Sequence, residues 1–90
     1  MNRLDNIRAR LIETLSPSLC QLEDDSASHR GHAGAASGGG HYNLRVVSAR
    51  FEGLNLVARH RLVYDSVRDM MQSEIHAIAI TAVAPSEVSE

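Results

Sequence analysis

A glycine-rich stretch, Asp24–Gly40, divides this chain of 90 residues into a shorter first part and a longer second part. It holds five of the six glycines, and its few apolar residues follow neither a helical nor a strand period. Because such a stretch buries little surface, it predicts an exposed, mobile loop within one domain that covers residues 1–90. The two halves must then build a single core together, and a loop of this length is more often functional than structural.

The halves carry helix and strand periods in a clear order. Alternating side chains predict strands over Leu19–Glu23 and His41–Ser48, and a helical period predicts a helix over Leu56–Met71. Ile75–Val83 is apolar on both phases, which indicates a strand covered on parts of both faces. Before the first strand, one helical face that ends ahead of Pro17 is formed by Leu4, Ile7, Leu11 and Leu15.

The order α-β-β-α-β predicts an α/β (α+β) fold around a three-stranded mixed sheet. Strands one and two should pair antiparallel, because only the glycine-rich loop joins them. The second strand, the long helix and the third strand form a right-handed crossover, so the third strand should lie parallel to the second. Both helices then cover one face of the sheet. A turn is expected at Phe51–Gly53 and a last helical turn at Pro85–Glu87.

The charge balance excludes some classes of function. The formal net charge is 9 − 11 = −2, and all nine basic residues are arginine, which argues against a general polyanion binder. The sequence has no apolar run long enough to span a bilayer, and its first residues lack the apolar core of a secretory signal. The single cysteine, Cys20, fits a reducing compartment. We therefore expect a cytoplasmic protein.

Signs of an enzyme are absent from the sequence. There is no phosphate-binding Gly-x-x-x-x-Gly-Lys motif, and the run Gly38–Gly40 precedes a strand rather than a helix. Cys20 shares a strand phase with Leu22, and a core position would raise the pKa of its thiol and make it inert. The segment Gly31–Gly34 matches the Gly-x-x-Gly clamp of KH domains, but it lies between strands instead of helices. We expect a protein without catalytic activity.

Five histidines are the candidates for metal binding. His60 lies on a helical stripe with Leu56, Val63, Val67 and Met70, so packing explains it better than ligation. His41 begins the second strand on its polar phase, where structural hydrogen bonding is the favoured role.

The other three histidines predict an incomplete metal site. His29 and His32 lie three residues apart in the loop, and His76 begins the third strand in phase with Ile78 and Ile80. Two or three imidazoles are too few for a closed structural zinc site, which needs four ligands. The pattern therefore indicates half a site that another molecule completes, while solvated loop histidines remain the alternative.

An arginine face on the long helix is the basis of a nucleic-acid hypothesis. Its residues are Arg59, Arg61 and Arg68, with Arg45 and Arg50 nearby in the sequence. Asp65 and Asp69 dilute the positive potential of this face, and few aromatic side chains are available to stack on bases. A solvated face with ion pairs is the alternative explanation.

Several motifs in sequence order resemble the BolA family over nearly the whole chain. They are Asp24-Asp25-Ser26, His29, His41-Tyr42, Val46-Val47-Ser48-x-x-Phe51-Glu52-Gly53, Val57-Ala58-Arg59-His60-Arg61-Leu62-Val63 and Ile75-His76-Ala77. The resemblance implies a fold similar to class II KH domains without the RNA-binding clamp, which agrees with the predicted order of elements.

The resemblance also implies function. Many BolA-like proteins partner a monothiol glutaredoxin and share with it a bridging [2Fe-2S] cluster, in iron–sulfur cluster trafficking or iron regulation. The glutaredoxin gives a Cys thiolate and a bound glutathione thiolate. The BolA-like chain gives the histidine that opens the third strand, here His76, and a loop ligand that is His or Cys. This loop has no Cys, so the chain is similar to the His-type branch, with His29 as the positional match and His32 as the alternative.

Two other functions stay open at this point. The family resemblance also implies DNA-binding transcriptional regulation, for which Arg59, Arg61 and Arg68 would be the contacts. The third possibility is an interaction module that binds the glutaredoxin without a cluster. Alone, the chain is expected to carry no cofactor and to be a monomer or a weak homodimer.

Overall fold

The computed structural model describes residues 2–25 and 40–88, and it confirms the predicted order of elements. The helices and strands are α1 (Arg3–Leu15), β1 (Leu19–Asp24), β2 (Gly40–Val47), α2 (Leu56–Ser66) and β3 (Ile75–Val83). Short 3₁₀ turns cover Ala49–Phe51, Arg68–Met70 and Pro85–Glu87. Each predicted strand lies within one residue of its observed bounds. Of the predicted loop Asp24–Gly40, the two end residues belong to β1 and β2, and residues 26–39 lie outside the described residues.

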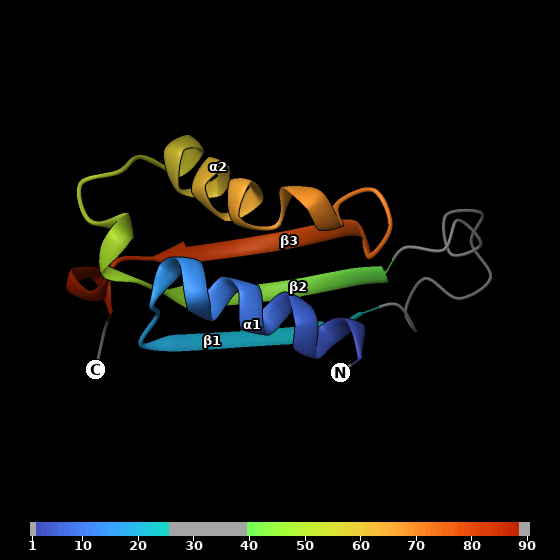
Figure 1. The fold of residues 1–90 in the computed structure, drawn as a ribbon. Helices are drawn as coiled ribbons and strands as arrows, with labels where there is room; N and C mark the ends of the chain where they lie inside the picture. Colours follow the sequence, from blue (N-terminus) through green and yellow to red (C-terminus); the bar gives the residue numbers. More distant parts are fainter. Residues whose placement is uncertain (1, 26–39, 89–90) are drawn as a thin grey trace.

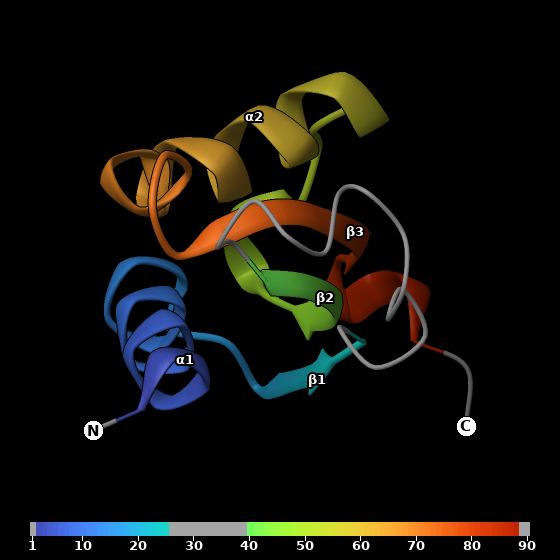
Figure 2. The same cartoon turned by 90° about the vertical axis from the view of Figure 1, so that its right-hand side faces the viewer.

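The three strands form one mixed sheet in the order β1-β2-β3. β1 pairs antiparallel with β2, and β3 pairs parallel with β2, both as predicted. The two views of the ribbon agree that the helices share one side of the sheet, with α1 over β1 and β2 and α2 beside β3 (Figures 1 and 2). Because β1 runs antiparallel and β3 runs parallel to β2, β1 ends at the same end of the sheet at which β2 and β3 begin.

Local signals in the sequence set the ends of α1. The Asn2 side chain accepts a hydrogen bond from the backbone N–H of Asp5 at 2.8 Å, which satisfies one of the free donors of the first turn. At the other end Ser16 adopts the left-handed conformation with φ 45°. Pro17 follows directly, so the helix cannot continue.

The core lies between the sheet and the two helices, and one buried polar residue ties its parts together. Ser48 is 1% exposed; its hydroxyl donates to the carbonyl of Leu15 at 2.6 Å and accepts from the N–H of Arg50 at 3.1 Å. Its own N–H donates to the carbonyl of Val83 at 3.1 Å. Ser48 therefore links the end of α1 to the ends of β2 and β3. The largest fully buried apolar side chains are Phe51, Ile7, Leu11, Leu15, Ile75, Val46, Val63 and Val67.

The second helix is shorter than the predicted Leu56–Met71. The α-helix ends at Ser66, and the chain continues in a 3₁₀ turn, where the N–H of Val67 bonds to the carbonyl of Tyr64 at 3.2 Å. Arg10 of α1 explains this end, because its guanidinium donates to the carbonyl of Ser66 at 3.1 Å and pairs with Asp69. A side chain from the other helix thus takes the carbonyl that a longer helix would have bonded itself.

The predicted buried stripe of this helix is correct only in its second half. Val63, Val67 and Met70 are buried, but Leu56 is 64% exposed and the neighbouring Val57 is 65% exposed. The first turn of α2 is instead held by polar contacts of Arg59, which are described below. In the described part of the chain, no helix is long and apolar enough to cross a membrane.

Candidate functional site

His76 is the second residue of β3 and lies at an irregularity in the pairing with β2. Gly40 pairs with Ile75, but the next residue, His41, pairs with Ala77. His76 is therefore an extra residue on β3, and the strand loses its alternation there: Ile75 and Ile78, three positions apart, are both buried. An extra residue of this kind re-aims a side chain.

This irregularity corrects the predicted phase of His76. The sequence placed His76 in phase with Ile78 and Ile80, which pack with the core. In the structure His76 is exposed, because the extra residue shifts the alternation between Ile75 and Ile78. The prediction that His76 lies at the start of the third strand is confirmed, because β3 covers Ile75–Val83 as expected.

The same irregularity brings a second imidazole to His76. The ring centroids of His41 and His76 lie 4.9 Å apart, with 46° between the ring planes. His41 is half-buried and His76 is exposed, so the pair is open to solvent on one side. The sequence favoured a structural hydrogen-bonding role for His41 over ligation and did not predict this contact with His76.

The backbone under the two histidines is held on both sides. The N–H of Asp25 donates to the carbonyl of His41 at 2.7 Å, which joins the end of β1 to β2. The N–H of Gly40 donates to the carbonyl of Glu74 at 3.2 Å, which joins β2 to the residue before β3. The buried side chain of Ile75, which is 1% exposed, further fixes the start of β3. The positions of both histidines are thus set by paired strands.

Gly40 is required at this end of the sheet by the ring of Tyr42. A Cβ placed on Gly40 would lie 2.6 Å from the Tyr42 hydroxyl oxygen and 2.7 Å from two ring carbons. Tyr42 is only 3% exposed, and burial raises the pKa of its hydroxyl despite the opposing effect of Arg3. A buried, neutral tyrosine therefore packs against the residue that precedes His41.

The remaining histidines do not join this pair within the described residues. His60 lines a separate open hollow of about 330 Å³ on α2, together with Val57, Arg61 and Tyr64. It is half-buried rather than part of the core, which corrects its predicted place on the buried stripe. His29 and His32 lie outside the described residues. Over residues 2–25 and 40–88, no three or more His, Cys, Asp and Glu side chains gather to hold a metal ion.

Cys20 lies where the sequence predicted it, on the core side of β1. It is half-buried, packs against the core cluster and pairs with Val46 in the sheet register. Burial raises the pKa of its thiol, so the reactive thiolate is disfavoured. Cys20 is thus a packing residue in this structure.

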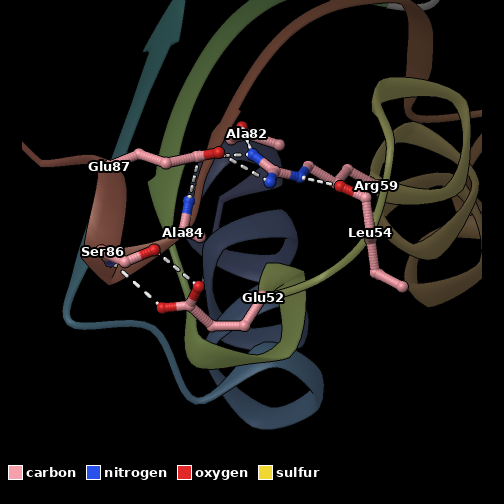
Figure 3. A network of polar contacts seen from close by, with 7 residues as sticks. All are labelled: Glu52, Leu54, Arg59, Ala82, Ala84, Ser86 and Glu87. Atoms are coloured by element: carbon pink, nitrogen blue, oxygen red, sulfur yellow. Dashed lines mark hydrogen bonds and ion pairs between the residues drawn. The ribbon is translucent and has the colours of Figure 1, made fainter.

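The arginines of α2 do not form one free basic face. Arg59 lies in the first turn of α2, and its Nη1 and Nη2 donate to the two Glu87 carboxylate oxygens at 2.6 and 2.9 Å (Figure 3). It also donates to the carbonyls of Leu54 at 2.8 Å and Ala82 at 3.2 Å. With its side chain only 12% exposed, Arg59 would have to break these bonds to reach a phosphate.

The carboxylate of Glu87 is fixed from two sides. Besides Arg59, the N–H of Ala84 donates to it at 2.9 Å, and the two contacts lower the pKa of Glu87 to about 2. The neighbouring Ser86 bonds to Glu52 through its N–H and hydroxyl, at 3.1 and 2.7 Å (Figure 3). This network attaches the C-terminal 3₁₀ turn to the start of α2.

The other two candidate arginines remain on the surface. Arg68 forms an ion pair with Asp65, as the alternative of a solvated helix face predicted. Arg61 is exposed and lines the same hollow as His60. The arginines predicted for nucleic acid thus include one that holds the fold together and one that is paired with a neighbouring acid.

Comparisons with known proteins identify the family. The family model described as BolA-like protein matches residues 11–87. "SufE-like protein 1, chloroplastic/mitochondrial" of Arabidopsis thaliana is 44% identical over 87 residues, which cover 91% of this chain and 24% of the relative. "BolA-like protein 1" of Mus musculus is 39% identical over 84 residues, covering 93% of this chain and 59% of the relative. The chain thus spans from a quarter to about three-fifths of the length of these curated relatives.

Solved structures agree with this assignment. The BolA domain of SufE1 from Arabidopsis thaliana has a TM-score of 0.85 and 42% identity, with 98% of each chain covered. BolA1 from Arabidopsis thaliana has a TM-score of 0.84 and 37% identity, with 99% of each chain covered. The sequence motifs, the mixed sheet with its two helices and these matches together show that the chain belongs to the BolA-like protein family.

Proposed function

We propose that this BolA-like chain partners a monothiol glutaredoxin and shares with it a bridging [2Fe-2S] cluster, in iron–sulfur cluster trafficking or iron regulation. The observation that carries the proposal is the exposed His76 at the open end of the sheet, on a backbone held by its neighbours. An imidazole in this position is accessible to a second protein.

The donors of the chain fit half of such a site. Around His76 the described side chains offer imidazole nitrogen, while Cys20 is turned to the core. The thiolates must therefore come from the partner, as a glutaredoxin with bound glutathione provides. Histidine in place of thiolate on one iron raises the reduction potential of a [2Fe-2S] cluster. The chain's own part is to hold neutral imidazoles at fixed positions.

The second ligand from this chain is proposed to come from His29 or His32. Both lie in the segment between β1 and β2, which leaves the sheet after Asp25 and returns at Gly40. The N–H of Asp25 bonds to the carbonyl of His41, so the segment starts and ends beside the His76 end of the sheet. This closeness supports a loop histidine as the second ligand that the chain supplies beside His76.

The geometry does not favour DNA binding as a second function, because Arg59 is bound to Glu87 and Arg68 is paired with Asp65, which leaves the exposed Arg61 as the remaining candidate contact. We also propose a cytoplasmic location. Docking of the glutaredoxin without a metal cluster is the alternative to the shared cluster, and the experiment below distinguishes the two.

Reconstitution tests the proposal directly. The chain is mixed with a monothiol glutaredoxin, glutathione, iron and sulfide, and visible circular dichroism is compared with that of the glutaredoxin alone. We expect a distinct spectrum that His76→Ala alters, together with one of His29→Ala and His32→Ala. His60→Ala is the matched control, because it removes a half-buried histidine from a separate hollow. Spectra identical to glutaredoxin alone would reject the shared cluster, and colourless co-elution on a sizing column would then indicate metal-free docking.

A further inference from the structure

The first turns of α2 carry apolar side chains that the fold leaves uncovered. Leu56 is 64% exposed, Val57 65% and Tyr64 39%, although Val63 of the same helix is packed into the core. A surface helix normally has one apolar stripe, which faces the core. We infer that this uncovered side of α2 is a docking surface for a partner protein, and that the partner presents a peptide segment with an apolar side chain and a carboxylate close together.

The docking surface is centred on the open hollow of about 330 Å³ that Val57, His60, Arg61 and Tyr64 line. These four residues are spaced i, i+3, i+4 and i+7, so they share one face of the helix over two turns. The volume is at the lower end of the range for ligand pockets, about 300–1,000 Å³, and therefore suits a small apolar anchor. His60 contributes a wall and not a donor, because its Nε2 is buried within the protein.

Arg61 sets the charge that the partner must carry. Arg61 is exposed, and no described residue forms an ion pair or a hydrogen bond with its guanidinium. The carboxylate of Asp65, four residues further along the helix, is paired with Arg68 instead. An unpaired guanidinium suits a carboxylate, with which it can form two parallel hydrogen bonds. Tyrosine and arginine are also the side chains that most often carry the binding energy of a protein interface.

A peptide segment fits this surface better than a polyanion does. Nucleic acids and anionic membranes are bound through several cations that lie near one another. Two other arginines of this region, Arg59 and Arg68, are already held in ion pairs. The chain also has a formal net charge of −2, which opposes the approach of a long polyanion. One carboxylate beside an apolar anchor requires only the single unpaired cation that the surface offers.

The docking surface and His76 lie towards opposite ends of β3. α2 begins near the end of β3, where Arg59 donates to the carbonyl of Ala82 at 3.2 Å, whereas His76 is at the start of the strand (Figure 1). A peptide bound along the first two turns of α2 therefore leaves the His76 end of the sheet uncovered. The inference thus goes beyond the proposed cluster and does not depend on it.

Titration of the full chain with two synthetic peptides tests the inference, by NMR chemical shifts of the backbone amides. The first probe is a short capped helical peptide with leucines and glutamates on one face, and the second has lysine in place of each glutamate. We expect the glutamate peptide to shift the amides of residues 56–64. The lysine peptide should bind at least about tenfold more weakly, because it brings a like charge to Arg61.

Three variants at exposed positions separate charge from apolar contact. Arg61→Glu should reverse the preference, so that the lysine peptide binds more tightly than the glutamate peptide. Tyr64→Ala should weaken both peptides, because it removes apolar contact area. Arg45→Glu is the matched control, since it changes the net charge by the same amount at an exposed position on β2, and it should keep the wild-type preference. Circular dichroism in the far ultraviolet checks that each variant is folded.

Several results would overturn the inference. They are the absence of binding of the glutamate peptide to the wild-type chain, equal binding of the two peptides, and an unchanged preference in Arg61→Glu. Concentration-dependent shifts of α2 without any peptide, lost in Tyr64→Ala, would show that a second copy of the chain occupies the surface and would likewise reject the acidic partner. No glutaredoxin, iron or sulfide is present, so failure here leaves the proposed cluster untouched.

Discussion

Gly40→Ala is the substitution whose effect the structure predicts most sharply. Gly40 does not have a positive φ, since Gly53 is the one described glycine that does. Alanine therefore fits its backbone, and replacing glycine at such a position usually stabilises a protein by about 0.4–1 kcal/mol, because the unfolded chain loses freedom. The new methyl group, however, would lie 2.6–2.7 Å from the ring and hydroxyl of Tyr42.

The clash should outweigh the entropic gain. Tyr42 is only 3% exposed, so moving its ring aside would disturb buried contacts. Forcing one extra carbon into a packed site typically costs about 1–3 kcal/mol. The net result should be a loss of about 0.5–2.5 kcal/mol in the free energy of unfolding, or several degrees in Tm for a domain of this size.

A double-mutant cycle with Tyr42→Leu isolates the contact. Leucine lacks the ring and hydroxyl atoms that the new methyl group meets, so in this background Gly40→Ala should be neutral or stabilising. Urea denaturation of the four proteins gives the coupling energy. If Gly40→Ala is equally destabilising in both backgrounds, the Tyr42 ring is not the cause and the explanation is refuted.

Three further predictions concern the core and the C-terminal turn. Ser48→Ala should lower the free energy of unfolding by about 1–3 kcal/mol in urea, because the carbonyl of Leu15 and the N–H of Arg50 lose a buried partner; an unchanged midpoint would contradict this. Val63→Ala, at 0% exposure, should cost about 2 kcal/mol through lost burial and a small cavity, whereas an equal truncation of the exposed Val57 should cost little. The pKa of Glu87 is lowered from 4.5 to about 2, so its stabilising effect is complete above about pH 4.5 and is lost as the pH falls towards 2. Urea denaturation at neutral pH and at about pH 3 measures how much the free energy of unfolding falls on acidification. This fall should be smaller in Glu87→Gln than in wild type, and an equal fall in both proteins would reject the role of this carboxylate.

The candidate site could be predicted in part from the sequence. The position of His76 at the start of a strand followed from the apolar run Ile75–Val83, and the observed strand has these same bounds. The approach of His41 could not be derived in this way, because it depends on which residues of β2 and β3 pair. One signal was present, since Ile75 and Ile78 are three apart in a strand and cannot both face the core without an irregularity.

The contacts of Arg59 could not be predicted from the sequence either. The helical period of α2 describes the direction of Arg59 only relative to its own helix. Its actual partners come from Leu54, Ala82 and Glu87, and the ion-paired Glu87 is 28 residues away in the sequence. The sequence therefore placed Arg59 on an arginine face of the helix, whereas the folded chain uses it to attach the C-terminal turn.

The sequence by itself determined the order of elements, the mixed sheet and the side of the sheet that the helices cover. These properties follow from local periods, from the order in which consecutive elements are connected and from the handedness of L-amino acid chains. Only the tertiary structure decided that His41 stands beside His76, that Arg10 ends α2 and that Gly40 must leave room for Tyr42. Each of these depends on the register and spacing between segments far apart in the chain, where a shift of one residue changes which side chains meet.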